Sequence, residues 1–286
     1  MTATKASAMR LAVDHVTTYH FAGPQRQGLQ RLRLTPLGAR GQNVIAWDIA
    51  CEGARHEVGY DDEYGNRVTL IGLNPGVDRI VIRAHGLVDT RDEAGVFGRH
   101  QGYLPLWHFA RDTVLTRPGE RVAALAARLR DHDPHDRLAV LHALSSHVAG
   151  VVRYETGHTG VATTAEAALA AGHGVCQDQA HVFIAAARVL GIPARYVSGY
   201  LLIDGHEAQD AGHGWAEAFV EGLGWVGFDV ANAVCPDDRY VRLAVGCDYA
   251  DAAPVKGLSV AASGDEAAAR EETIAVALSV RVMTAA

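Results

Sequence analysis

One stretch of the sequence constrains the fold more than any other, because it has the composition of a helix that is apolar on nearly every face. Residues 176–190 are mostly apolar, and Gly191 and Pro193 follow directly. A helix without a wide polar face has to be buried, and glycine followed by proline is typical of a helix end. The sequence therefore predicts a central, enclosed helix that begins at Cys176.

The first part of the chain has a different character. Up to about residue 115, short apolar runs alternate with turn residues, as in 16–21, 67–71 and 77–84. This pattern is typical of antiparallel strands. We therefore expect a β-rich N-terminal domain over residues 10–115.

Helices come first in the second part, and strands follow them. Apolar residues recur at helical spacing after Pro118, and Thr163 with Glu166 forms a candidate capping box for a short alanine-rich helix. Strands are predicted after the central helix. The expected fold class is α+β, with a second domain over residues 116–248 in which the central helix packs on an antiparallel sheet.

The end of the chain shows strict alternation. Apolar residues occupy every second position from Ile274 to Val282, which predicts a strand with one buried face. We expect a strand over residues 272–284 to return to the N-terminal β domain. Residues 249–271 have no clear periodicity and are predicted to be a linker.

Composition argues against several classes of protein. Acidic residues outnumber basic ones by 33 to 26, and the net charge is −7, without the basic stripe of a nucleic-acid-binding protein. No run approaches the roughly 18 apolar residues of a membrane span, and residues 1–10 lead into no apolar core of a secretory signal. We therefore expect a cytoplasmic protein that binds neither nucleic acid nor membrane.

The cysteines and histidines suggest no cofactor. The four cysteines form no C-x-x-C pair, which argues against a zinc ribbon and against a disulfide scaffold. Histidines and acids gather at residues 206–213, but with spacings that match no metal motif. We expect neither a metal nor another cofactor. The sequence does not determine the oligomeric state.

Cys176 lies at the predicted helix start, where a thiol can act as a nucleophile. The partial positive charge and unpaired N–H groups of a helix N-terminus favour the thiolate and can hold a developing oxyanion. Asp178, in the first helical turn, would oppose the thiolate if its side chain faced Cys176, so a base is needed elsewhere in the chain. The alternative is that Cys176 is a small residue of the core.

His213 and Asp229 are the strongest candidates for that base and for an acid that orients it. They lie 16 residues apart on the arms of a predicted hairpin with residues 221–223 as its loop. Such a loop pairs Val220 with Gly224, which places His213 and Asp229 on one face, roughly 7 Å apart. A loop of even length would place them on opposite faces. His181 lies about 140° around the helix from Cys176 and is not favoured as the base.

Four segments together resemble the bacterial transglutaminase-like superfamily, whose members are described as cysteine proteases. They are G-V-C-Q-D-Q-A-H at 174–181, G-I-P-A-R-Y-V-S-G-Y at 191–200, H-G-W-A-E at 213–217 and G-W-V-G-F-D at 224–229. Residues 11–89, with R-L-T-P at 33–36 and Y-G-N-R-V at 64–68, resemble the N-terminal region of that family. Segments 248–251 and 254–257 are similar to its C-terminal part. This chain departs from the family pattern at Gly214, Gln179 and Val230-Ala231.

The resemblance implies a papain- or transglutaminase-like core and a cysteine-dependent hydrolase acting on a peptide or small amide. Cys176 would be the nucleophile, His213 the base and Asp229 its orienting acid, with a thioester intermediate. We predict substrate or oxyanion contacts for Gln177, Trp215, Tyr154 and His158, and a cleft wall from residues 203–211. Two alternatives remain open, which are transfer of the acyl group to an amine and a non-catalytic peptide-binding protein with the same fold.

Overall fold

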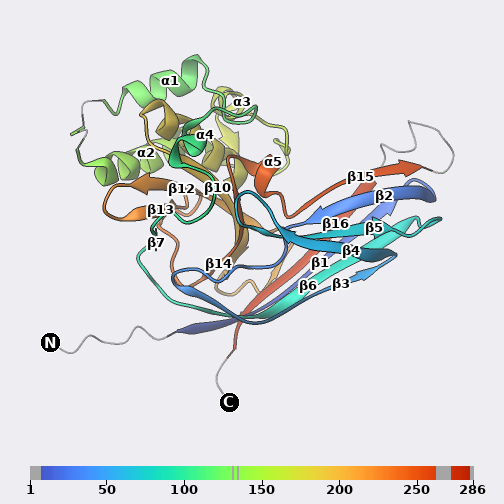
Figure 1. The fold of residues 1–286 in the computed structure, drawn as a ribbon. Coiled ribbons are helices and arrows are strands. Elements are labelled where there is room, and N and C mark those ends of the chain that lie inside the picture. Colours follow the sequence, from blue (N-terminus) through green and yellow to red (C-terminus); the bar gives the residue numbers. More distant parts are fainter. Residues whose placement is uncertain (1–7, 131, 134, 262–271, 284–286) are drawn as a thin grey trace.

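Two antiparallel sheets form the β-rich part of the computed structural model, which describes residues 8–130, 132–133, 135–261 and 272–283. The first has the order β11 (Ala208–Gln209), β16 (Glu272–Val282), β1 (Met9–Phe21), β6 (Arg79–Thr90) and β3 (Gln42–Glu52). The second has the order β15 (Val255–Ala261), β2 (Gln25–Leu32), β5 (Arg67–Leu73) and β4 (Ala54–Asp61). Figure 1 shows both extending to one side, away from the helices.

A third sheet carries the helical part of the molecule. Its order is β14 (Tyr240–Gly246), β10 (Ala194–Leu201), β12 (His213–Val220), β13 (Gly224–Phe228) and β7 (Val96–Gly98). Helix α4 (Cys176–Val189) packs on β10 and β12, and α1 (Glu120–Ala127), α2 (Arg137–Val151) and α3 (Ala165–Ala171) surround it. The remaining elements are the 3₁₀ helix Leu106–Ala110, α5 (Tyr249–Ala252) and the short parallel pair β8 (Arg153–Tyr154) and β9 (His173–Gly174).

The predicted central helix is confirmed. Every residue of α4 from Asp178 to Arg188 is buried, as expected of a helix that is apolar on most faces. The predicted α+β fold class is confirmed as well. The β16 strand also returns as predicted, since it pairs antiparallel with β1 from Leu11↔Val282 to Phe21↔Glu272.

The predicted linker is wrong over the residues that the structure describes. Residues 249–252 form α5, and 255–261 form β15, which pairs with β2 from Val255↔Leu32 onward. A strand at the edge of a sheet is held by the backbone hydrogen bonds of its neighbour, so its own sequence needs no strong alternation. Residues 262–271 of the predicted linker lie outside the described residues.

The two predicted domains exchange strands. Strand β7 belongs to the predicted 10–115 domain but pairs with β13 of the third sheet. Strand β11 belongs to the predicted 116–248 domain but pairs with β16 of the first sheet. The two parts of the chain therefore interlock.

The predicted capping box is also wrong. Thr164, not Thr163, caps α3, because its side chain accepts a hydrogen bond from the backbone nitrogen of Ala167. Glu166 instead accepts backbone hydrogen bonds at the start of α1, from Gly119, Arg121 and Val122. These N–H groups have no partner within their own helix, so a carboxylate from a distant segment satisfies them.

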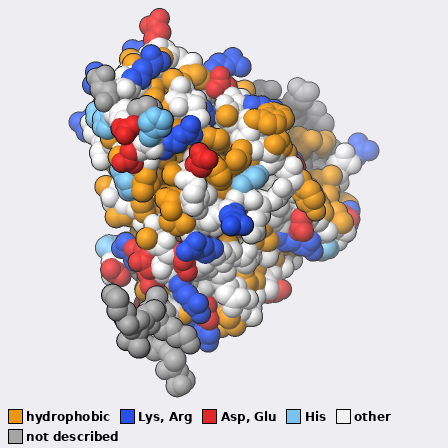
Figure 2. Space-filling view, turned by 60° about the vertical axis from the view of Figure 1, so that its left-hand side comes forward, with side chains coloured by type: hydrophobic (Ala, Val, Ile, Leu, Met, Phe, Trp, Pro, Cys, Tyr) orange, Lys and Arg blue, Asp and Glu red, His pale blue; other side chains and the backbone are white. Residues whose placement is uncertain are grey.

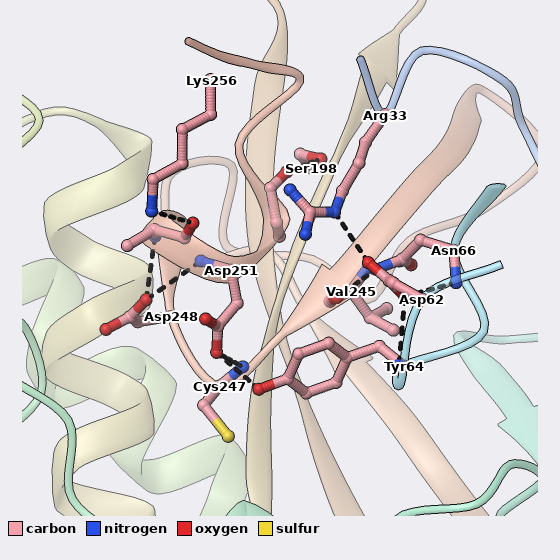
Figure 3. Close-up of polar contacts among 12 residues, drawn as sticks. Arg33, Asp62, Tyr64, Asn66, Ser198, Val245, Cys247, Asp248, Asp251 and Lys256 are labelled. Atoms are coloured by element: carbon pink, nitrogen blue, oxygen red, sulfur yellow. Dashed lines mark hydrogen bonds and ion pairs between the residues drawn. The ribbon is translucent and has the colours of Figure 1, made fainter. Parts of the chain in front are cut away.

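A buried ion pair lies in the segment that joins the N-terminal sheets to the third sheet (Figure 3). Asp62 accepts a hydrogen bond from Arg33 Nε at 2.8 Å, and both side chains are almost completely buried. Asp62 also accepts from the backbone and side-chain nitrogens of Asn66. Asn66 in turn exchanges two hydrogen bonds with the backbone of Val245 in β14, both at 2.8 Å.

Tyr64 extends this contact to α5. Its hydroxyl donates to Asp251 Oδ2, and the same oxygen accepts from the backbone nitrogen of Cys247 (Figure 3). The segments at 33–36 and 64–68 that resemble the family's N-terminal region therefore form the junction between the two parts of the molecule.

The surface and the helices give two further observations. Figure 2 shows one face, on which hydrophobic side chains gather near the centre and acidic and basic side chains are scattered around them. Among the described residues, no helix is long and apolar enough to cross a membrane.

Replacing Asp62 with Asn is expected to destabilise the protein by about 3–5 kcal/mol, because the buried Arg33 guanidinium would lose its counter-charge. Urea denaturation followed by circular dichroism measures this change. Asp61→Asn is the matched control. Asp61 pairs with Arg67 at 3.2 Å, but both side chains are about half exposed, so the loss should stay below about 1 kcal/mol. Equal stabilities for the two variants would contradict the prediction.

Candidate active site

The loop before α4 places the Cys176 thiol at a tightly constrained helix start. Asp178 Oδ2 accepts hydrogen bonds from Val175 N of this loop at 2.8 Å and from Thr159 Oγ1, in the segment between β8 and α3, at 2.7 Å. A Cβ atom on Gly174 would lie 2.7 Å from the Asp178 side chain, so only glycine fits there. The Asp178 charge, expected to oppose the thiolate, is thus engaged by loop donors.

His213 and Asp229 meet as the predicted hairpin register requires. Strands β12 and β13 pair with Val220 opposite Gly224 and Phe219 opposite Trp225. His213 begins β12, and Asp229 directly follows β13. His213 Nε2 donates to Asp229 Oδ2 at 2.7 Å.

Asp229 is a buried carboxylate with several donors around it. Oδ2 also accepts from Asn232 Nδ2 and from the Tyr240 hydroxyl, both at 2.7 Å, and Oδ1 accepts from Ala231 N at 3.1 Å. Burial alone raises the pKa of Asp229, but the hydrogen bond and charge of His213, together with Asn232 and Tyr240, lower it below its ordinary value. Asp229 therefore remains a carboxylate at neutral pH.

His213 carries a proton in this environment. Burial lowers the pKa of the imidazole, but hydrogen bonds to Asp229 and Cys176 and the charges of both groups outweigh it and raise the pKa from 6.5 to about 10. Because Nε2 is bound to Asp229, Nδ1 remains for the sulfur. The interactions of the protonated ring therefore stabilise the fold. Their contribution is complete below about pH 6.5 and is lost as the pH rises through about 10.

A cavity of about 650 Å³ opens beside Cys176 and His213. Its walls come from β1, β10, β16 and the segment that joins β14 to β15. Gln177 and Tyr154, both predicted to contact substrate, lie on its wall. Of the predicted 203–211 wall, Ala211 lines the cavity and Ile203 does not. Both parts of the molecule therefore shape the space in front of the thiol.

Two predicted contact residues lie elsewhere. Trp215 is 1% exposed and lies beneath His213, with ring centroids 6.2 Å apart, so it supports the histidine ring from within the core. His158 packs against the ring of His173 at 4.8 Å and faces Glu155. Neither Trp215 nor His158 lines the cavity. Burial rules out a direct substrate contact for Trp215, whereas the contact of His158 with substrate stays a prediction.

Sequence analysis did not identify three residues of the site. Tyr240 lies on β14, and only the assembled sheet brings it to Asp229, so no local signal points to it. Asn232 follows Asp229 by three residues, a spacing at which a side chain readily bonds a preceding carboxylate. Tyr196 lines the cavity, and its hydroxyl would lie 1.9 Å from a Cβ atom on Gly214. Glycine at position 214 thus makes room for that hydroxyl.

Another departure from the family pattern has a structural role. Gln179 is buried in α4, and its Nε2 donates to the backbone oxygen of Val152 at 2.7 Å. This bond ties the central helix to the end of α2. Among the described residues, no three histidine, cysteine, aspartate or glutamate side chains are grouped so as to hold a metal ion.

Comparison with known proteins places the chain in a family. The sequence model of the transglutaminase-like superfamily matches residues 123–230, and that of the bacterial transglutaminase-like N-terminal region matches residues 11–89. An uncharacterised protein of Mycobacterium leprae is 31% identical over 263 residues, which cover 87% of this chain and 92% of the relative. The chain belongs to the transglutaminase-like superfamily.

Two further comparisons show how far the likeness of this transglutaminase-like protein extends. An uncharacterised protein of Mycobacterium bovis is 28% identical over 276 residues, covering 87% of both chains. A solved structure from Cytophaga hutchinsonii, described as a candidate cysteine protease, has a TM-score of 0.78 at 20% identity and covers 98% of this chain and 93% of its own. That likeness shows a shared fold.

Asp229→Asn is expected to lower the pKa of His213 from about 10 toward its ordinary value of about 6.5, because an amide dipole replaces a full charge. NMR titration of ¹³C-labelled histidine measures the change, with His213→Gln identifying the resonance. Tyr240→Phe retains the carboxylate and is expected to give a smaller change. An unaltered His213 pKa in Asp229→Asn would show that the carboxylate does not hold the proton there.

Proposed function

We propose that this protein is a cysteine-dependent amide-bond hydrolase that forms a thioester with Cys176. The observation that carries the proposal is that His213 donates to Asp229 at 2.7 Å and lines the same cavity as Cys176, whose charge helps to raise the pKa of the imidazole. The sulfur stands at a helix N-terminus and faces a cavity. A thiol, an imidazole and an orienting carboxylate in this order are the parts needed for nucleophilic acyl transfer.

In the first half of the reaction, Cys176 Sγ attacks the carbonyl carbon of the amide and a tetrahedral oxyanion forms. The imidazolium of His213 gives its proton to the amide nitrogen, the C–N bond breaks, and the amine leaves. His213, now neutral, takes a proton from water while the water oxygen attacks the thioester. The C–S bond then breaks, the carboxylic acid is released, and the thiolate–imidazolium pair is restored.

The oxyanion requires donors that are already in place. Backbone N–H groups in the first turn of α4 are one source. The Tyr196 hydroxyl is a second source, because Tyr196 lines the cavity together with Cys176. Its ring is held between His181, with centroids 5.3 Å apart, and Tyr249, at 5.9 Å. A locked ring gives the hydroxyl a defined position at no reorganisation cost.

Water is the proposed acceptor, and an amine is the alternative. Both reactions share the thioester, so the products distinguish them. Mass spectrometry of reactions run with and without a primary amine such as putrescine identifies the acceptor. A free acid as the main product in the presence of the amine supports a hydrolase, whereas an amine conjugate indicates transfer.

Cys176→Ala is expected to lower turnover of a peptide and amide panel by about 10⁴-fold or more, because no other group can form the thioester. The variant removes one small atom and should keep its thermal stability. Cys235→Ala is the matched control. Its thiol is partly buried, and burial raises its pKa, so it should retain activity. Undiminished turnover in Cys176→Ala would refute the proposal, as would a thiol that iodoacetamide leaves unlabelled in mild acid.

Tyr196→Phe is expected to lower kcat by about 10²-fold with little change in KM, as does loss of one oxyanion donor elsewhere. Gly214→Ala should act in the same direction, because its methyl group would occupy the place of the hydroxyl. Steady-state kinetics on the best substrate of the panel measures both. A loss confined to KM would assign Tyr196 to ground-state binding instead.

A further inference from the structure

The cavity beside Cys176 has an unusual charge distribution for this chain. None of the described residues that line it is aspartate or glutamate, although the chain contains 33 acidic residues. Most of the wall is apolar or aromatic. Five tyrosines line it, at positions 19, 154, 196, 200 and 249. Burial lowers the pKa of His15, on the β1 wall, to about 4, so this histidine is neutral.

Lys256 is the one lysine or arginine among the described lining residues. It lies near the start of β15, and its Nζ donates to the backbone oxygen of Ala250 at 3.2 Å (Figure 3). An ammonium group has three donors, so two remain for another partner. No ion pair of Lys256 occurs in the part of the chain that the structure describes.

The neighbouring carboxylates are engaged elsewhere. Asp248 Oδ1 caps α5 by accepting from the backbone nitrogens of Ala250 and Asp251, and Asp248 is 4% exposed. Asp251 Oδ2 accepts from the Tyr64 hydroxyl and from the backbone of Cys247. Figure 3 shows the Asp251 side chain directed toward Tyr64, away from Lys256. The ammonium therefore keeps an unused charge at the cavity wall.

We propose that the substrate of Cys176 carries a carboxylate, which Lys256 binds while the scissile amide lies at the thiol. The inference rests on the proposed function, since it names the class of amide that the site accepts. A cavity of about 650 Å³ suits a ligand of several residues. In a mostly apolar cavity, a cation that is not paired with a carboxylate selects a ligand group of opposite sign and disfavours a ligand cation. The carboxylate is either a chain terminus or an acidic side chain.

Thiol alkylation tests this inference without requiring turnover. The probes are the chloroacetyl derivatives of glycine, 4-aminobutyrate and 6-aminohexanoate, each as the free acid and as the primary carboxamide. Cys176 Sγ displaces chloride and forms a C–S bond with the probe in every case, so only charge and reach differ. Mass spectrometry of the peptide that contains Cys176 gives the labelling rates at low ionic strength.

For at least one of the three probe lengths, the acid should label Cys176 at least about tenfold faster than its carboxamide, as a charge-assisted hydrogen bond predicts. Lys256→Met should bring this ratio close to one, and Lys256→Arg should retain most of it. Lys256 is exposed, so the substitutions should not affect folding. Arg281→Met is the matched control. It removes the same charge from β16, outside the cavity lining, and should leave the ratio unchanged.

Equal rates for acids and carboxamides at all three lengths would overturn the inference, and so would an unchanged ratio in Lys256→Met. Chloroacetyl-Gly-Glu amide and chloroacetyl-Gly-Gln free acid, compared with chloroacetyl-Gly-Gln amide, distinguish a side-chain carboxylate from a terminal one. Failure of the proposed function remains separable. A charge-dependent labelling rate without amide cleavage contradicts the proposed function alone, whereas cleavage with equal labelling rates contradicts this inference alone.

Discussion

The hydrogen bond between His213 and Asp229 is the interaction on which the candidate site depends. A buried carboxylate is costly unless donors surround it, and Asp229 has donors from its own turn, from β12 and from β14. Those donors are present together only when the third sheet is complete. The Asp229 carboxylate, which holds the proton on His213, therefore depends on the whole sheet. Helix α4 supplies the Cys176 thiol.

The N-terminal sheets are part of the site as well as its support. The junction through Asp62 and Asn66 attaches them to β14, and strands β1 and β16 then close one side of the cavity. Their return strand comes from the far end of the chain. A substrate would consequently contact both parts of the molecule, with the reacting bond on α4 and the remainder against the β-rich part.

Local sequence predicted the elements whose physical cause is local. The apolar composition of α4, the alternation of β16 and the three-residue hairpin loop each determine their own geometry, and the register of β12 with β13 followed from counting. Predictions failed where a distant partner decides. Glu166 caps α1 because tertiary packing brings it there, and β15 forms because β2 offers an unpaired edge. Trp215 was expected at the surface of the cleft, but the cluster around Tyr240 buries it.

By itself, the sequence determined that a cysteine begins a buried helix and that a histidine and an aspartate share one face of a hairpin. Periodicity and loop length act over a few residues, so they can be deduced from the chain alone. Only the tertiary structure decided which groups surround the Asp229 carboxylate, since the Tyr240 hydroxyl reaches it from another strand of the sheet. It also decided the character of the cavity, because β1, β16 and Lys256 come from opposite ends of the chain. Contacts between distant segments depend on the packing of the whole molecule, and no local pattern encodes them.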